Sequence, residues 1–105
     1  MTDTCNIDSD FNELPSEDEI YNMVNVFKAI SDPTRLCILY LLEDTELCSC
    51  RIQEALNKPQ PTISHHINIL KNAGLIKGRK KGTWIYFSLS NNKIINMLED
   101  LKAIF

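Results

Sequence analysis

Hydrophobic and polar residues follow helical spacing through the first folded part of the chain. Ser16 is followed three residues later by Glu19, and this capping-box pattern predicts that a helix begins next to Ser16. Apolar side chains then recur every three or four residues, as they do on one face of an α-helix. These positions are Ile20, Val24, Phe27 and Ile30. The pattern predicts an amphipathic helix over residues 17–30.

Three further helices are predicted in the middle of the chain. Asp32 followed by Pro33 is typical of a helix start, because aspartate caps free backbone N–H groups and proline fits the first turn. Gly74 is typical of the position just beyond a helix end. The predicted helices span residues 33–43, 49–56 and 61–72.

The last part of the chain has the pattern of a β-hairpin followed by a helix. Residues 77–82 form a basic segment with two glycines, which we interpret as a loop, and residues 83–89 are rich in aromatic and β-branched side chains that favour strands. A final helix is expected over residues 91–104, with Ile94, Leu98 and Leu101 at helical spacing. The predicted fold is therefore mostly α with a small β-hairpin, in the order α-α-α-α-β-β-α.

Charge is distributed unevenly along the 105 residues. The formal net charge is −3, but residues 1–27 contain seven acids and no Lys or Arg, whereas residues 51–82 contain seven bases and one acid. Residues 1–15 also lack hydrophobic periodicity, so we expect a flexible acidic arm followed by one domain over residues 16–105. The basic segment indicates an anionic partner such as nucleic acid.

Composition excludes several classes of protein. The longest apolar run, residues 36–42, is far shorter than the roughly 20 residues that a membrane helix needs. The acidic N-terminal segment does not resemble a secretory signal, so we expect a cytoplasmic protein whose four cysteines remain thiols. We expect no enzyme, because the sequence contains no glycine-rich phosphate loop and no paired catalytic carboxylates.

The order short helix, turn, helix and basic hairpin is that of a helix-turn-helix with a wing. On a helical wheel, residues 61–72 place their apolar side chains on one face and a small polar face without acids opposite. Such side chains can bond base edges in the major groove, although a merely solvated face has the same appearance. The expected DNA contacts are Thr62, Ser64, His65 and Asn68, with Arg79, Lys80 and Lys81 at the hairpin tip.

Three stretches resemble the ArsR/SmtB family of winged-helix repressors. Residues 29–36 resemble the family's "DPTRL" helix opening, residues 46–50 its "ELCxC" metal motif, and residues 60–66 its recognition helix. The resemblance implies a winged helix-turn-helix homodimer that binds a palindromic double-stranded DNA operator and is released by an inducer. It adds Gln60 to the expected DNA contacts and places the dimer interface on the first and last helices. The interface candidates are Ile20, Val24, Phe27, Ile94, Leu98 and Leu101.

Cys48 and Cys50 lie at the start of the short helix, where unpaired N–H groups lower thiol pKa values. Thiolates are soft ligands, suited to arsenic(III), Cd(II) or Pb(II). Spacing alone favours two small buried residues, but the "ELCxC" context of the resemblance favours an ion. The family's arsenic pattern has a third cysteine where this chain has Gln53. A further ligand must therefore be recruited, with Cys5 of the arm as the first candidate and Cys37 as the second.

The sequence thus predicts a repressor that senses a soft metal or metalloid ion through thiolates and then releases its operator. A thiol-based redox sensor of the same fold is the main alternative, because the cysteines could form a reversible disulfide or persulfide instead. A constitutive DNA-binding protein with inert cysteines is a further alternative.

Overall fold

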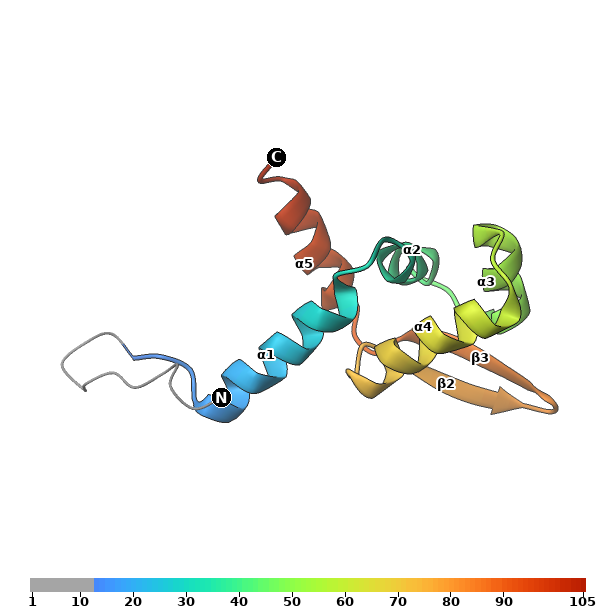
Figure 1. The fold of residues 1–105 in the computed structure, drawn as a ribbon, viewed down its shortest axis with the longest axis horizontal. Coiled ribbons are helices and arrows are strands. Elements are labelled where there is room, and N and C mark those ends of the chain that lie inside the picture. Colours follow the sequence, from blue (N-terminus) through green and yellow to red (C-terminus); the bar gives the residue numbers. More distant parts are fainter. Residues whose placement is uncertain (1–12) are drawn as a thin grey trace.

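The computed structural model describes residues 13–105, which form helices around a small three-stranded sheet (Figure 1). The predicted arm over residues 1–15 lies mostly outside the described residues. The elements, in chain order, are α1 (Glu17–Ile30), α2 (Pro33–Leu41), β1 (Leu47–Cys48), α3 (Ser49–Leu56), α4 (Gln60–Asn72), β2 (Ile76–Lys81), β3 (Trp84–Leu89) and α5 (Lys93–Lys102). Their order confirms a mostly helical winged helix-turn-helix.

Local sequence signals set the starts of the first two helices. The Ser16 hydroxyl accepts a hydrogen bond from the backbone N–H of Glu19, and the Glu19 carboxylate accepts one from the backbone N–H of Ser16. Asp32 likewise accepts from the backbone N–H of Arg35, and Pro33 occupies the first turn of α2. Both helices therefore begin where their caps predict.

The hydrophobic core lies between the helix-turn-helix and the sheet. It is built by apolar side chains that α2, α3 and α4 direct toward one another and toward the inner face of the sheet. The largest fully buried side chains are Ile38, Leu39, Leu42, Ile52, Ile63 and Leu70. This packing fixes α3 against α4 and leaves the opposite face of α4 open to solvent.

The basic segment that we interpreted as a loop is a strand. β2 pairs with β3 in antiparallel register up to Lys81 and Trp84, so the turn consists of two residues, and Gly82 adopts a φ of 63° there. The strand forms through backbone pairing with β3. Its sequence could not predict it, because a run of exposed basic residues shows no alternation of apolar and polar side chains. The short strand β1 was also not predicted. It pairs with the other edge of β3, which gives the order β1-β3-β2.

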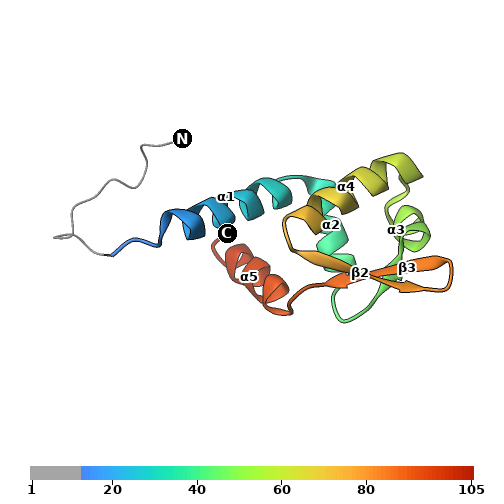
Figure 2. The same cartoon turned by 90° about the horizontal axis from the view of Figure 1, so that it is seen from below.

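Helices α1 and α5 lie toward the end of the molecule opposite the hairpin tip (Figures 1 and 2). The Tyr40 hydroxyl donates a hydrogen bond of 2.7 Å to Glu99, which ties α5 to α2. Of the expected interface positions, Val24, Phe27 and Leu101 are exposed, and Ile20 and Ile94 are half-buried. Leu98 is only 4% exposed and packs in the protomer's own core, so it offers little free surface to a partner.

None of the helices in residues 13–105 combines the length and hydrophobicity required to cross a membrane.

Candidate nucleic-acid interface and thiol site

Helix α4 separates an inner apolar face from an outer polar one. Ile63, Ile67 and Leu70 are buried, and the predicted polar contacts lie around the remaining surface. The side chains of Gln60, His65 and Asn68 are exposed, and those of Thr62 and Ser64 are half-buried. The Gln60 amide donates a hydrogen bond of 2.9 Å to the Ser64 hydroxyl, one turn along the helix. The surface can present amide, hydroxyl and imidazole groups to base edges.

His66, beside this face, has a structural role, as its position at the margin of the apolar face predicts. A guanidinium N–H of Arg35 lies 3.0 Å from its Nδ1 atom, and the Nε–H of the same guanidinium donates to the backbone oxygen of Ala29. The Asp32 carboxylate lies 3.9 Å from the same Nδ1 atom. These contacts join the end of α1 and the start of α2 to the middle of α4. They therefore hold the polar face of α4 at a fixed orientation to the first two helices.

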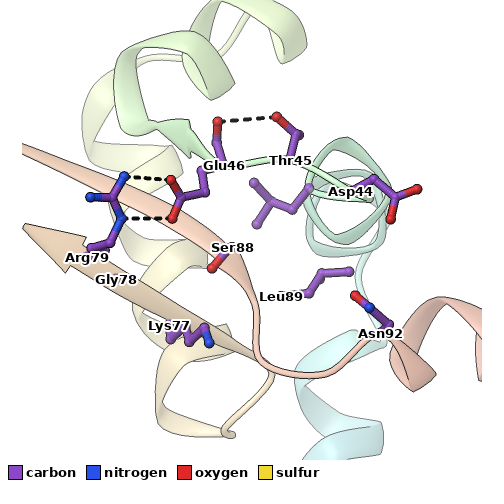
Figure 3. A pocket seen from close by; sticks show the side chains of 10 residues that line it. Asp44, Thr45, Glu46, Lys77, Gly78, Arg79, Ser88, Leu89 and Asn92 are labelled. Atoms are coloured by element: carbon purple, nitrogen blue, oxygen red, sulfur yellow. Dashed lines mark hydrogen bonds and ion pairs between the residues drawn. The ribbon is translucent and has the colours of Figure 1, made fainter.

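The predicted basic residues of the wing lie on strand β2, with Arg79 inside the strand and Lys80 and Lys81 at its end next to the turn. Arg79 makes two hydrogen bonds to the Glu46 carboxylate, of 2.7 and 3.0 Å, and Figure 3 shows both. These contacts raise the pKa of Arg79 and lower that of Glu46. Lys80 and Lys81 are exposed, and Lys81 is paired with Trp84 next to the turn. With Lys77, which is also exposed on β2, the wing thus presents three lysines and one arginine that already has a partner.

The outer face of the sheet brings the wing and the thiol segment together. Cys48 on β1 is paired with Tyr86 on β3, and Tyr86 is paired with Arg79 on β2. Residues paired directly across strands point to the same face of a sheet, so the three side chains form one row. The Arg79 guanidinium lies 5.7 Å from the centre of the Tyr86 ring. The sulfur of Cys48 and a basic side chain of the wing are therefore separated by one aromatic ring.

Cys48 and Cys50 place their sulfur atoms 2.7 Å apart at the start of α3. Cys48 is the residue before the first helical turn and is only 9% exposed, whereas Cys50 is exposed. The hydrogen bond from Cys50, with help from backbone N–H groups of the helix start, lowers the pKa of the Cys48 thiol. The same hydrogen bond raises the pKa of Cys50. The contact therefore favours the thiolate at Cys48 over that at Cys50.

The predicted third ligand is not near this pair in the part of the chain that the structure describes. Residues 13–105 contain no group of three Cys, His, Asp or Glu side chains able to hold one ion. Cys37 is exposed on α2 and is not among the residues around the pair, and Cys5 lies outside the described residues. Gln53, at the position of the missing cysteine, donates a hydrogen bond to Ser49. An open pocket beside the two thiols is lined by Glu46, Leu47, Arg51, Trp84 and Tyr86.

Sequence reasoning did not identify Glu46, Tyr86 or Arg35 as parts of these sites. Glu46 and Arg79 are 33 positions apart, and Arg35 and His66 are 31 apart. Pairs at such separations carry no local signal. The alternation of side chains along β3 could have placed Tyr86 on the outer face, had the partner strand been predicted.

Comparison with known proteins identifies the family of this chain. Residues 32–77, which run from the cap of α2 into β2, match the model described as "Bacterial regulatory protein, arsR family". An uncharacterized HTH-type transcriptional regulator of Methanocaldococcus jannaschii is 51% identical over 80 residues, which cover 72% of this chain and 90% of the relative. The transcriptional repressor SdpR of Bacillus subtilis is 53% identical over 68 residues, covering 65% and 76%. A homolog of the cadmium resistance regulatory protein CadC from Staphylococcus aureus is 39% identical over 79 residues, covering 74% and 65%.

A solved structure has the same fold and is described as an assembly. The homodimeric winged helix-turn-helix DNA-binding domain of Mb0332 from Mycobacterium bovis, a possible ArsR-family transcriptional regulator, superposes with a TM-score of 0.76. It is 25% identical, and the match covers 86% of both chains. The chain belongs to the arsR family of bacterial regulatory proteins and is a DNA-binding transcriptional regulator rather than an enzyme.

Proposed function

We propose that the protein is a homodimeric repressor that binds operator DNA through α4 and the wing and releases it when a soft metal or metalloid ion binds Cys48 and Cys50. The 2.7 Å separation of the two sulfur atoms is the observation that carries the sensing part of this proposal. The acid-free polar face of α4 and the lysines of β2 support the DNA-binding part. Phosphate contacts from the wing would orient α4 over the base edges.

Exposed apolar side chains on α1 and α5 support a dimer. Phe27 is 54% exposed, and Val24 and Leu101 are also exposed to solvent. Apolar surface gathered on two neighbouring helices marks an interaction site more often than scattered single residues do. The homodimeric relative has the same fold. A second copy of the chain is therefore the proposed partner of these helices.

Two thiols in hydrogen-bond contact suit a soft ion. Arsenic(III), Cd(II) and Pb(II) all prefer thiolate ligands, and Cys48 is already biased toward the thiolate. The similarity to a cadmium resistance regulator agrees with such an ion. Because the described residues bring only two sulfurs together, the proposal assigns the remaining coordination to Cys5 of the arm.

The position of the pair explains how an ion would affect DNA binding. Cys48 lies directly before α3, and α3 packs on α4 through core residues that include Ile52 and Ile63. Drawing the two sulfurs around an ion would shift the start of α3 and with it the orientation of α4. A coupling of about 1–3 kcal/mol is typical of such allosteric links.

Ultraviolet difference absorption tests the ligands directly, because thiolate-to-metal charge transfer adds a band to the absorption of the free protein. Titration of the full chain with Cd(II) should produce this band, and the Cys48→Ser and Cys50→Ser variants should each lose a large part of it. Cys37→Ser is the matched control and should behave as the wild type. An unchanged band in Cys48→Ser would contradict the assignment.

The contact between the sulfurs also favours a second function, redox sensing. Oxidation by a peroxide would join Cys48 and Cys50 in a disulfide and reduce the peroxide to water, with the two thiol protons passing to that water. Operator binding that is lost with peroxide and restored with a thiol reductant, both under chelator, would favour this function. A response to Cd(II) without oxidant would favour metal sensing.

A further inference from the structure

The ion pair between Glu46 and Arg79 occupies the side chain of the wing that is best suited to bind a phosphate group. The contact is bidentate, with hydrogen bonds of 2.7 and 3.0 Å. Glu46 comes from the segment just before β1, and Arg79 belongs to β2. The Arg79 side chain is 54% exposed and that of Glu46 38%. The pair therefore lies at the surface, at one side of the pocket drawn in Figure 3.

Arginine matches a phosphate group better than lysine does, because its planar guanidinium donates two parallel hydrogen bonds. Arg79 is flanked on the same face of β2 by Lys77 and Lys81, since alternate residues of a strand share a face. Within residues 13–105, neither lysine has an acid within ion-pair distance. Arg79 is thus the central cation of this row and the one that a carboxylate already occupies.

We infer that Glu46 takes the place of a DNA phosphate, and that Arg79 leaves Glu46 for the phosphate when the wing reaches DNA. A carboxylate and a phosphate offer the same pair of oxygen acceptors to a guanidinium. An exposed ion pair is weak, because water and salt screen it, whereas a DNA strand presents a closely spaced row of phosphates. A phosphate can therefore replace Glu46 as the partner of Arg79. Breaking the contact with Glu46 nevertheless costs free energy and weakens the binding of the wing to DNA.

The ring of Tyr86 allows Arg79 to exchange its partner without a movement of the strands. Tyr86 lies under the guanidinium of Arg79 and is fixed by strand pairing on both sides. A cation over a tyrosine ring keeps this contact whichever anion it binds at its edge. Arg79 can therefore change partners without rearranging β2 or β3. Glu46 then acts as a residue that lowers the affinity of the wing for DNA in general.

This inference rests on the proposed role of the wing in DNA binding, and a double-mutant cycle separates the two. The probe is a short fluorescent duplex of mixed sequence, because phosphate contacts do not depend on the bases. Dissociation constants are measured by anisotropy in the full chain over a range of salt concentrations. The variants are Glu46→Gln, Arg79→Gln and the double variant. The control, Glu54→Gln, carries the same charge change and disrupts another acid–arginine pair, that with Arg51.

We expect Glu46→Gln to bind this duplex about two- to fivefold more tightly than the wild type, as the release of an exposed ion pair allows. In the Arg79→Gln background the same substitution should have no more effect than Glu54→Gln has, and for this comparison the control is also made as the Glu54→Gln/Arg79→Gln double variant. Arg79→Gln alone should weaken binding and make the slope of log affinity against log salt shallower by about one. Circular dichroism verifies that each variant is folded.

Two results would overturn the exchange. If Glu46→Gln binds more weakly than the wild type, the ion pair persists on DNA and positions the wing. If it binds more tightly to the same extent with and without Arg79, only net charge is responsible. A failure of the proposed DNA-binding role is a different result: Arg79→Gln would then change neither the affinity nor the salt slope.

Discussion

Arg35 on α2 and His66 on α4 meet at a distance of 3.0 Å between a guanidinium nitrogen and the imidazole Nδ1 atom. A guanidinium only donates hydrogen bonds, so Nδ1 must accept. The ring is then neutral, with its proton on Nε2. Because Arg35 also donates to the backbone of Ala29, one side chain links the first two helices to the helix that faces DNA.

Replacing His66 should therefore cost stability as well as DNA binding. The His66→Ala variant leaves a partly buried guanidinium N–H without its acceptor, and we expect a loss of about 1–3 kcal/mol in the free energy of unfolding. Urea denaturation followed by circular dichroism measures it. His65→Ala is the matched control: its side chain is exposed, so this variant should keep the stability of the wild type and lose only DNA affinity. Equal stability of the two variants would show that the Arg35 contact has no structural role.

The stability of the protein should also fall in mildly acidic solution. Burial is the main cause that lowers the pKa of His66, and the positive charge of Arg35 adds to it, while Asp32 acts in the opposite direction. A histidine whose pKa is lower in the folded state binds fewer protons there than in the unfolded chain. Its contribution is thus present above the unfolded pKa of about 6.5 and is lost as the pH falls through the folded value.

His66→Gln tests this dependence, because glutamine keeps an acceptor but does not titrate. The urea midpoint of the wild type should decrease more steeply between about pH 7 and pH 5 than that of the variant. Asp32 changes the stability only at lower pH, because its pKa is lowered. Burial alone would raise this pKa, but the hydrogen bond from the backbone N–H of Arg35 and the nearby positive groups outweigh that effect. If the urea midpoints of the wild type and His66→Gln decrease in parallel over this pH range, the pH dependence does not come from His66.

Local signals in the sequence were sufficient for the helices but not for the sheet. The capping box at Ser16 and the Asp32–Pro33 pair mark helix starts by contacts within three residues, and both were correctly predicted. Strand β1 contains two residues and exists only because Leu47 and Cys48 pair with Phe87 and Tyr86, far along the chain. No pattern within a two-residue segment can indicate such a partner.

The same distinction applies to the functional residues. The Cys48 and Cys50 pair was found from its motif, and the structure brings the two sulfurs together. The partners Glu46 of Arg79 and Arg35 of His66 depend on tertiary packing and were not found. Helical periodicity placed Ile94, Leu98 and Leu101 on one face, but it could not distinguish a side chain that enters the protomer's core from one left for a partner. Leu98 is buried in the protomer's core, whereas Leu101 is exposed.

A charged side chain on the exposed face of α1 should dissociate the proposed dimer. Phe27→Asp introduces a carboxylate that could not be buried at an apolar interface without a large cost, and we expect a monomer in analytical ultracentrifugation. Trp84→Asp is the control, because Trp84 on the wing is 55% exposed, close to the value for Phe27. This variant should remain dimeric. A dimer in Phe27→Asp would require an interface away from α1.

Removal of Cys5 should weaken ion binding without abolishing it. With two sulfurs from the start of α3 and none from the arm, Cd(II) or Pb(II) would lose one of its thiolate ligands, and the charge-transfer band should decrease in intensity per bound ion. Competition with a chelator gives the affinity, and deletion of residues 1–12 should have the same effect as Cys5→Ser. Cys37→Ser should leave the affinity unchanged. If Cys37→Ser weakens ion binding and Cys5→Ser does not, the third ligand is Cys37.

Operator release on ion binding is the most direct test of the proposed function. An operator duplex is first selected from random sequences with the ion-free protein, and its dissociation constant is measured by anisotropy with and without Cd(II), Pb(II) or arsenic(III). We expect at least one ion to weaken binding by about five- to 150-fold in the wild type and to have no effect on the Cys48→Ser/Cys50→Ser double variant. If none of the three ions changes the operator affinity of the wild type, the protein is not a sensor of these ions.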